Sequence, residues 1–207
     1  MADNEKTCPL SCVDCAVTAC RYGRDNYPAF CLTKAMSEED KASVLPLYND
    51  GDVNSKYAFW SATVEGTYYG EMARVEETME FARRVGAVKI GLAYCCELKA
   101  EAELYAKILD INGFETYMID CRAGDLDAGE VLDDQHNGRK LCNPVLQARL
   151  LNKAGVDMNI LMGLCAGSDA LFVKNASAMT TILINKDRLT CNNPAVTLYR
   201  PERRKLV

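Results

Sequence analysis

The stretch KIGLAYCC (89–96) decides the fold, because it is an apolar run that ends on two cysteines. Three later stretches have a similar form: FETYMIDC (114–121), MNILMGLC (158–165) and TTILINKDRLTC (180–191). Each apolar run predicts a buried strand, and the four expected strands are 88–94, 115–120, 158–164 and 179–185. Because helix-like stretches separate the runs, the pattern predicts a parallel sheet with right-handed crossovers.

The helices expected between these strands are recognised by apolar faces and by start and stop residues. Residues 98–112 carry an apolar face, and Gly113 is suited to end that helix. Asn143 is suited to cap a helix over 144–154, and a shorter helix is expected over 168–176. We therefore predict an α/β fold, a three-layer domain of Rossmann or flavodoxin type with a mostly parallel sheet.

Composition divides the chain into three predicted zones. Residues 1–35 hold five cysteines among polar and turn-forming residues, with too few aliphatic residues to close a core, so we expect a metal-binding module there. Residues 36–87 have helical periodicity, and Ser37 with Asp40 fits a capping box. This helical segment is expected to pack on the α/β domain, residues 88–207.

Charge and hydropathy exclude several classes of protein. The chain has 207 residues, 49% of them hydrophobic and 26% charged, which is ordinary for a globular protein. A formal net charge of −5 argues against a nucleic-acid partner, because phosphate-binding domains are normally basic. The sequence contains no apolar run of membrane-spanning length, and its first residues do not resemble a signal peptide. We expect a cytoplasmic protein with no membrane partner.

Cysteines at the ends of the expected strands indicate a metal site. The carboxyl ends of parallel strands meet at one edge of the sheet, where such folds bind ligands. Thiolates gathered there would repel one another without a cation, so we predict a metal. The predicted ligands at this edge are Cys95, Cys121, Cys142 and Cys165, with Cys96 and Cys191 as additional candidates. Each single cysteine could also be a buried structural residue.

The N-terminal cysteines form a second candidate metal site. The spacing Cys12-x2-Cys15-x4-Cys20-x10-Cys31 offers four sulfur atoms, enough for zinc or for a [4Fe–4S] cluster. Cys8 is an alternative ligand in this zone.

Three glycines and one histidine are further candidates. Near the strand ends, Gly124, Gly163 and Gly167 would let the backbone approach a bulky prosthetic group closely, although each also suits an ordinary turn. His136 is the one histidine, in a polar loop, and its plain interpretation is a solvated side chain. There is no glycine-rich dinucleotide fingerprint and no phosphate-binding loop.

Several stretches resemble one known family. They are CVDCAVTACRYG (12–23) with FC (30–31), ARVEETMEFARRVGAVKIGLAYCCELKAEAE (73–103), CRAGD (121–125), CNPVLQARLLNKAGVDMNILMGLCAGSD (142–169) and KDRLTCNNPAVTLY (186–199). In combination they resemble the metal-binding family catalogued as domain of unknown function 1847. The resemblance implies metal binding at the two cysteine sets named above and an anaerobic prokaryote as source. It also implies histidines where this sequence has Ser168 and Asn192.

The sequence therefore predicts an iron–sulfur protein of anaerobic metabolism, serving electron transfer or a cluster-based reduction. Its cofactor is expected to be one or two iron–sulfur clusters of the [4Fe–4S] type, with zinc as the alternative. The competing hypotheses are a non-enzymatic zinc protein, structural or sensing, and a thiol enzyme that uses Cys95 or Cys165 as nucleophile. Whether the protein is an enzyme is left open. A redox partner protein and a homo-oligomer are the expected partners.

Overall fold

The computed structural model describes residues 11–49 and 51–204, and the chain divides into two compact units. The first unit is Met1–Phe59 and the second is Trp60–Val207. Each unit is described by itself, and the three predicted zones stay a prediction.

Short helices make up the first unit. They are η1 (Cys12–Asp14), α1 (Ala19–Tyr22), α2 (Leu32–Ala35), α3 (Glu38–Val44), η2 (Leu45–Tyr48) and the start of α4 (Val53–Thr67). The predicted capping box is confirmed, because the Ser37 hydroxyl accepts from the Asp40 N–H at 3.0 Å and the Asp40 carboxylate accepts from the Ser37 N–H at 3.3 Å. Among the described residues of this unit, only Ala19 is fully buried. The described residues of this unit therefore form almost no apolar core of their own, and its metal-binding role stays a prediction.

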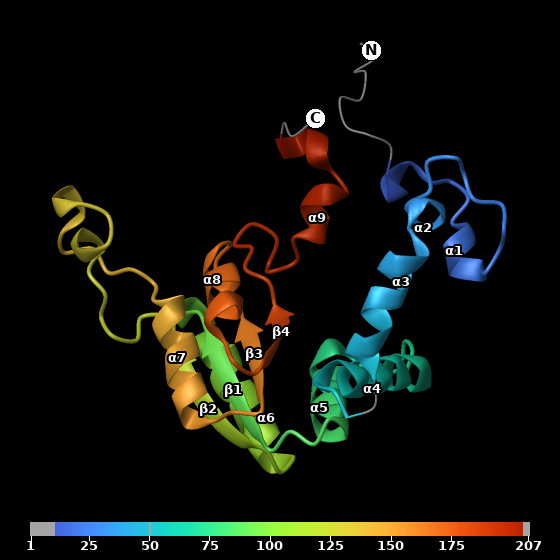
Figure 1. Ribbon diagram of the computed structural model, residues 1–207. Coiled ribbons are helices and arrows are strands. Elements are labelled where there is room, and N and C mark those ends of the chain that lie inside the picture. Colours follow the sequence, from blue (N-terminus) through green and yellow to red (C-terminus); the bar gives the residue numbers. More distant parts are fainter. Residues whose placement is uncertain (1–10, 50, 205–207) are drawn as a thin grey trace. The chain divides into compact units, whose positions relative to one another are not determined.

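A four-stranded parallel sheet forms the centre of the second unit (Figure 1). Its strands are β1 (Lys89–Tyr94), β2 (Glu115–Asp120), β3 (Met158–Met162) and β4 (Met179–Ile184). They lie in the order β2-β1-β3-β4, and every pair is parallel. The predicted α/β fold class is therefore confirmed, and this order begins the doubly wound arrangement seen in flavodoxin-like folds.

Helices cover both faces of this sheet. The longer ones are α5 (Arg74–Arg84), α6 (Lys99–Ile111), α7 (Pro144–Ala154) and α8 (Ser168–Asn175). Short ones complete the unit: η3 (Cys96–Leu98), η4 (Ala128–Glu130), η5 (Asp134–His136), α9 (Ala195–Leu198) and η6 (Pro201–Arg204). The predicted strands and the three predicted helices agree with these bounds to within two residues. Within the described part of the chain, no helix has the length and apolar composition needed to cross a membrane.

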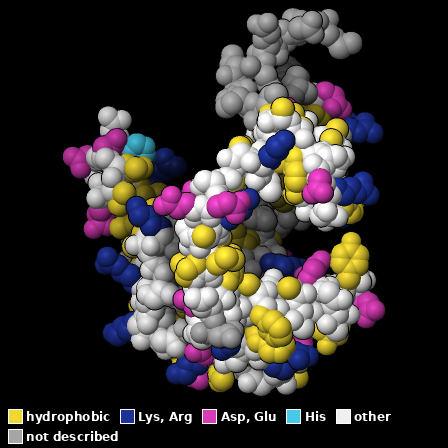
Figure 2. Space-filling view, turned by 45° about the vertical axis from the view of Figure 1, so that its right-hand side comes forward, with side chains coloured by type: hydrophobic (Ala, Val, Ile, Leu, Met, Phe, Trp, Pro, Cys, Tyr) yellow, Lys and Arg dark blue, Asp and Glu magenta, His cyan; other side chains and the backbone are white. Residues whose placement is uncertain are grey.

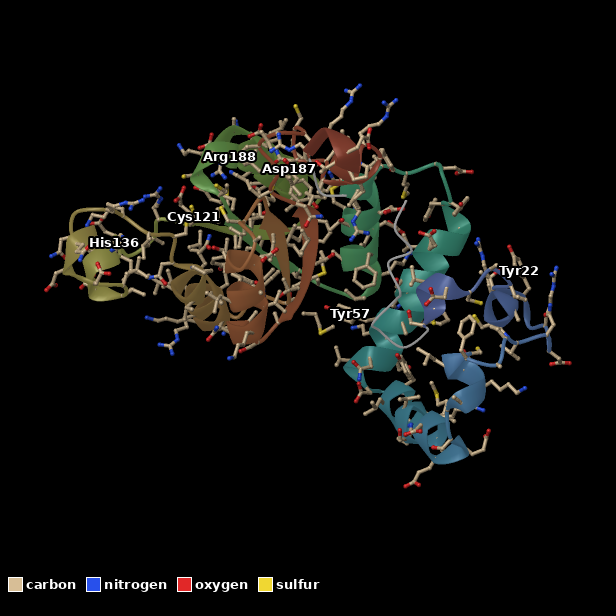
Figure 3. All side chains as sticks on the ribbon, turned by 90° about the horizontal axis from the view of Figure 1, so that it is seen from above. Tyr22, Tyr57, Cys121, His136, Asp187 and Arg188 are labelled. Carbon is tan, nitrogen blue, oxygen red and sulfur yellow. The ribbon has the colours of Figure 1, made fainter. Side chains whose placement is uncertain are left out.

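The alternation of side chains along β1 assigns the helices to the two faces. Ala93 and Cys95 pack in one cluster with Leu151 of α7 and Phe172 of α8. Leu92, one residue away, must point to the opposite face, where α6 contacts β1 and β2. Figures 1 and 3 show the sheet between these helices, so the three predicted layers are present.

The burial of β1 explains why its sequence is so informative. All but the first of its residues are buried, because β1 lies inside the sheet and is covered on both faces. A strand buried on both faces reads as a nearly continuous apolar run. β2 and β4 are the edge strands of the described sheet, and most of their residues are only half-buried.

The segment between β2 and α7 projects from the second unit. A bridge between Asp127 and Lys140 holds its two sides together, and the Ala128 N–H donates to the Arg139 carbonyl at 2.7 Å. Figure 2 shows His136, in cyan, on this projecting part beside acidic and hydrophobic side chains.

The packing of Gly91 gives a first testable prediction. A Cβ added there would lie 2.6 Å from Asn159 Oδ1 and 2.9 Å from Leu151 Cδ1, so Gly91→Ala should lower the free energy of unfolding by about 2 kcal/mol. Urea unfolding measures this change. Gly66→Ala is the control, because nothing lies within 4 Å of its added Cβ and alanine favours the helix, so its stability should not fall.

A pH dependence follows from Glu80. The Arg84 side chain, then Arg83, holds the pKa of this carboxyl below its ordinary value of 4.5, with both contacts at 2.7 Å. A depressed carboxyl pKa stabilises the fold above the unfolded-state pKa, and this contribution is lost as the pH falls through the folded-state pKa. The stability difference between wild type and Glu80→Gln should therefore be constant above pH 4.5 and shrink below it.

Thermal unfolding from pH 7 to pH 3 measures that difference. Glu103→Gln is the control, because Glu103 pairs with Lys99 while half of its side chain is exposed. An equal pH dependence in both variants would contradict the role of Glu80.

Candidate metal centre

Three thiols meet at the carboxyl edge of the sheet. The sulfur atoms of Cys95, Cys96 and Cys121 all lie within 4.8 Å of one another. Cys95 and Cys121 are buried, with 3% and 1% exposed, whereas Cys96 is exposed. Among the described residues, this is the one group of three or more potential metal ligands drawn from histidine, cysteine and acidic side chains.

The pairing of β1 with β2 brings two of these thiols together. Tyr94 lies opposite Asp120 in the parallel register, so Cys95 and Cys121 follow at the same level. Both belong to the cluster on the α7 face of the sheet. The Cys95 N–H also donates to the Met162 carbonyl at 3.0 Å, which extends the pairing with β3 by one residue. Backbone hydrogen bonds therefore position this pair.

A buried glutamine of α7 holds the same two strand ends. Gln147 is fully buried, and its amide nitrogen donates to the Tyr94 carbonyl at 3.3 Å and to the Ile119 carbonyl at 2.8 Å. Both partners are acceptors, which identifies this end of the amide as the nitrogen. Gln147 thus ties the end of β1 to the end of β2 just before their cysteines.

Cys142 supplies a fourth thiol at the start of α7. The Asn143 N–H donates to the Cys121 carbonyl at 2.7 Å, and the Asn143 side chain caps the helix by accepting from the Leu146 N–H at 3.0 Å. The half-buried Cys142 side chain thus packs against the cluster that contains Cys121. Of the predicted ligands, Cys95 and Cys121 are brought together with Cys96, whereas Cys142 packs nearby but outside this three-sulfur group, so its role as a ligand stays a prediction.

Burial governs the protonation of Cys121. Desolvation raises the pKa of its thiol well above the ordinary value of 9.0, and the neighbouring Cys142 raises it further, although the Cys96 N–H donates to its sulfur at 3.4 Å. Without a cation, Cys121 is therefore a neutral thiol at neutral pH. A bound metal would compensate the thiolate charge and release the proton.

Basic side chains lie next to the thiols. The Lys186 ammonium is 3.0 Å from the Cys95 sulfur, in the segment after β4. Arg122 directly follows Cys121, and the nearby Cys142, then Cys96, raises the pKa of its guanidinium. Arg188 lies near Cys165, which adds to the larger effect of Glu97 in raising the pKa of this guanidinium. These positive charges favour negatively charged sulfur at the edge of the sheet.

Glu97 links two of these cations. Its carboxylate lies 2.6 Å from Lys186 Nζ and accepts from Arg188 at 2.7 Å and 3.0 Å. The Arg188 guanidinium, then Lys186, lowers the pKa of Glu97 to about 2, so this carboxylate is charged at neutral pH. Because Glu97 follows β1 and its partners follow β4, the network connects the ends of two strands that β3 separates in the sheet.

The remaining predicted ligands of the edge lie outside the three-sulfur group. Cys165 is half-buried beside Arg188, and Cys191 is exposed with a positive φ of 53°. Figure 3 looks onto the strand ends and shows Cys121 and Arg188 over the same edge, whereas His136 lies away on the projecting segment. His136 ends η5, contacts Asp133 at 2.5 Å and is partly exposed, apart from the thiols.

The N-terminal cysteines are described in the first unit alone. Within residues 11–49 and 51–204, no three of them have sulfur atoms within 4.8 Å of one another, so their role as a metal site stays a prediction. The Thr18 N–H donates to the Cys15 sulfur at 3.4 Å, and the backbone N–H of Lys34 lowers the pKa of the Cys31 thiol. The full set is Cys12, Cys15, Cys20 and Cys31. Cys8 lies outside the described residues.

Protein packing accounts for two of the predicted glycines. All three have positive φ, and a Cβ on Gly124 or Gly163 would collide with the side chain of Leu146 or Leu98, respectively. Nothing lies within 4 Å of the Cβ position of Gly167. Close approach to a prosthetic group therefore stays a prediction for all three.

The two positions at which the resemblance implies histidine have local structural roles. The Asn192 side chain accepts from the Asp187 N–H at 3.0 Å and its own N–H donates back at 2.8 Å, which closes the loop after β4. Ser168 begins α8, and its N–H donates to the Cys165 carbonyl at 2.9 Å.

Sequence analysis did not single out Gln147, Lys186, Arg188 or Glu97. One usable signal was the basic pair in the segment KDR (186–188), which follows an expected strand directly, as the cysteines do. No signal in the sequence marked Gln147 as a buried residue, because a polar residue in a helix is normally exposed.

The site as a whole is a sulfur-rich edge of a parallel α/β domain. Thiolate donors favour zinc, copper(I) and iron–sulfur centres over hard cations such as magnesium. Cys95, Cys96 and Cys121 could hold a metal, and Cys142 packs nearby.

Comparison with known proteins assigns the chain to a family. The family model described as "protein of unknown function (DUF1847)" matches residues 31–183, and the chain belongs to this family. An uncharacterised protein of Methanocaldococcus jannaschii is 37% identical over 193 residues, covering 92% of this chain and 94% of the relative. No solved structure matches the chain.

The role of Gln147 gives a testable prediction. Gln147→Leu removes the donor from two strand-end carbonyls, so the free energy of unfolding should fall by about 2 kcal/mol. Urea unfolding measures this loss. Gln135→Leu, at an exposed loop position, is the control and should change stability little. Equal stability of the two variants would exclude the proposed tie between the strands.

Proposed function

We propose that this protein is a metalloprotein whose sheet-edge thiols ligate an iron–sulfur centre used for electron transfer or for a reduction. The proposed ligands are Cys95, Cys96, Cys121 and Cys142. The observation that carries the proposal is that three sulfur atoms at the ends of two neighbouring strands all lie within 4.8 Å of one another.

The surroundings of the thiols support a redox centre. An iron–sulfur centre carries the negative charge of its thiolates, and its reduction potential depends on net charge, burial and hydrogen bonds to sulfur. Lys186 contacts Cys95, Arg122 lies near Cys96, and the Cys96 N–H contacts the Cys121 sulfur. Each of these groups stabilises negative charge on sulfur, as such a centre requires.

A single zinc ion is the second candidate, and the sulfur spacing favours it. A tetrahedral ion with metal–sulfur bonds of about 2.3 Å places its sulfur ligands about 3.8 Å apart. A [4Fe–4S] cluster binds each thiolate to a different iron, so the sulfurs would have to separate on loading. A smaller iron centre, with two thiolates on one metal atom, would need less rearrangement.

The thiol-enzyme hypothesis has weaker support. Lys186 would favour a thiolate at Cys95, but this residue is only 3% exposed, which hinders attack on a substrate. Cys165 is more accessible, yet its position beside Arg188 at the start of α8 is the sole feature in its favour.

The N-terminal cysteines are proposed to hold a second centre. Their spacing supplies four sulfurs, and Cys15 accepts an N–H···S contact of the kind that stabilises bound thiolates. The near absence of buried residues in the described first unit adds to this proposal, because a metal would provide the missing stabilisation. A redox partner protein would be the source or acceptor of the electrons.

Metal and sulfide analysis of anaerobically purified protein tests the proposed function. We expect a brown protein with absorption near 400 nm, with iron and acid-labile sulfide bound in comparable amounts. Cys121→Ser should remove the iron of the edge centre, while Cys15→Ser should remove only that of the N-terminal centre. Cys191→Ser is the matched control, because Cys191 is exposed and outside the sulfur group, and it should keep the wild-type content.

The possible results separate the candidates. Colourless protein with stoichiometric zinc that is lost in Cys121→Ser would replace the iron–sulfur proposal by the zinc protein. Protein in which Cys121→Ser and Cys191→Ser bind the same amount of metal would refute the edge centre altogether.

A further inference from the structure

Lys186 is a buried cation in contact with a proposed ligand. Only 5% of its side chain is exposed, and its ammonium lies 3.0 Å from the Cys95 sulfur and 2.6 Å from the Glu97 carboxylate. A lysine ammonium is ordinarily charged at neutral pH, and the ion pair with Glu97 favours the charged form. The ammonium is therefore charged and aimed at sulfur.

The position of Lys186 follows from a register shift in β4. Leu161 pairs with Ile182, but Met162 pairs with Ile184, so one extra residue of β4 lies between them. Such an irregularity changes the face toward which later side chains point. It lies directly before the segment that delivers Lys186 to the end of β1, and irregularities of this kind are frequent beside functional sites.

Glu97 carries the opposite charge to Lys186, but its side chain is more exposed to solvent. Half of its side chain is exposed, and it is shared with the exposed Arg188. Charges in solvent are screened more strongly than buried ones. The potential at Cys95 is therefore set mainly by Lys186, and Glu97 reduces it by a smaller amount.

We propose that Lys186 is a positioning residue that orients the Cys95 sulfur and raises the reduction potential of the edge centre, with Glu97 as its opposing charge. This inference rests on the proposed iron–sulfur function. On reduction, an external one-electron donor is oxidised and the centre gains one negative charge. The nearby ammonium stabilises the reduced form more than the oxidised form, whereas the carboxylate does the opposite.

Potentiometric titration of the holoprotein, followed by absorption and electron paramagnetic resonance, tests the inference. Lys186→Met keeps the aliphatic stem and removes the charge, so the equilibrium constant for reduction should fall at least tenfold, equivalent to about 59 mV for one electron. Lys186→Arg keeps the charge and should retain most of the wild-type potential. Glu97→Gln should raise the potential by a smaller amount.

Lys153→Met is the matched control. Lys153 lies exposed in the last turn of α7, whereas Cys142 and the proposed centre lie at the start of that helix. Removing this charge should leave the potential unchanged. A general effect of losing one lysine would appear in both methionine variants.

The outcomes distinguish this inference from the function on which it rests. A wild-type protein without a redox-active centre would overturn both. A wild-type centre whose potential is unchanged in Lys186→Met and Glu97→Gln, or shifted in the same direction by both, would overturn only the role of Lys186. If Lys186→Met fails to load, an increase in potential in Glu97→Gln together with a retained potential in Lys186→Arg would support the inference, and their absence would reject it.

Discussion

The parallel pairing of β1 with β2 is the constraint on which the candidate metal centre depends. With Tyr94 opposite Asp120, Cys95 and Cys121 leave their strands at the same level and on the same face. A shift of one residue would turn one thiol toward the opposite helix layer. Gln147 reinforces the register from α7 by binding a carbonyl of each strand. The buried thiols of the site are thus positioned by hydrogen-bonded strand ends, as a preorganised ligand set requires.

Charged side chains from neighbouring segments surround these thiols. Thiols grouped at a half-buried edge need positive charge before they can ionise. The segment after β2 supplies Arg122, and the segment after β4 supplies Lys186 and Arg188. Glu97 connects the last two and limits their net charge. These charges would also stabilise a thiolate-bound metal. The cysteines and their charged neighbours therefore both favour an all-sulfur centre at this edge.

The strands, the helices that connect them and the fold class could be predicted because their signals are local. β1 and β3 are buried on both faces and read as apolar runs, while Asn143 and Gly113 mark helix ends through their own side-chain and backbone chemistry. Cys95 and Cys121 could be placed at one edge because parallel strands end on the same side. The charged partners of these cysteines could not be predicted. Lys186 is 91 residues from Cys95 in the chain, and the two come into contact only through the strand order and a register shift.

By itself, the sequence determined a parallel α/β domain with a thiol-rich edge, since hydrophobic periodicity and turn chemistry act between near neighbours in the chain. Tertiary structure alone decided which sulfurs meet, leaving Cys142, Cys165 and Cys191 out of the close group and bringing Cys96 into it. It also decided which charges face them. Such contacts depend on distances of a few ångströms between segments far apart in the chain, and these distances are set by strand order, register and helix packing.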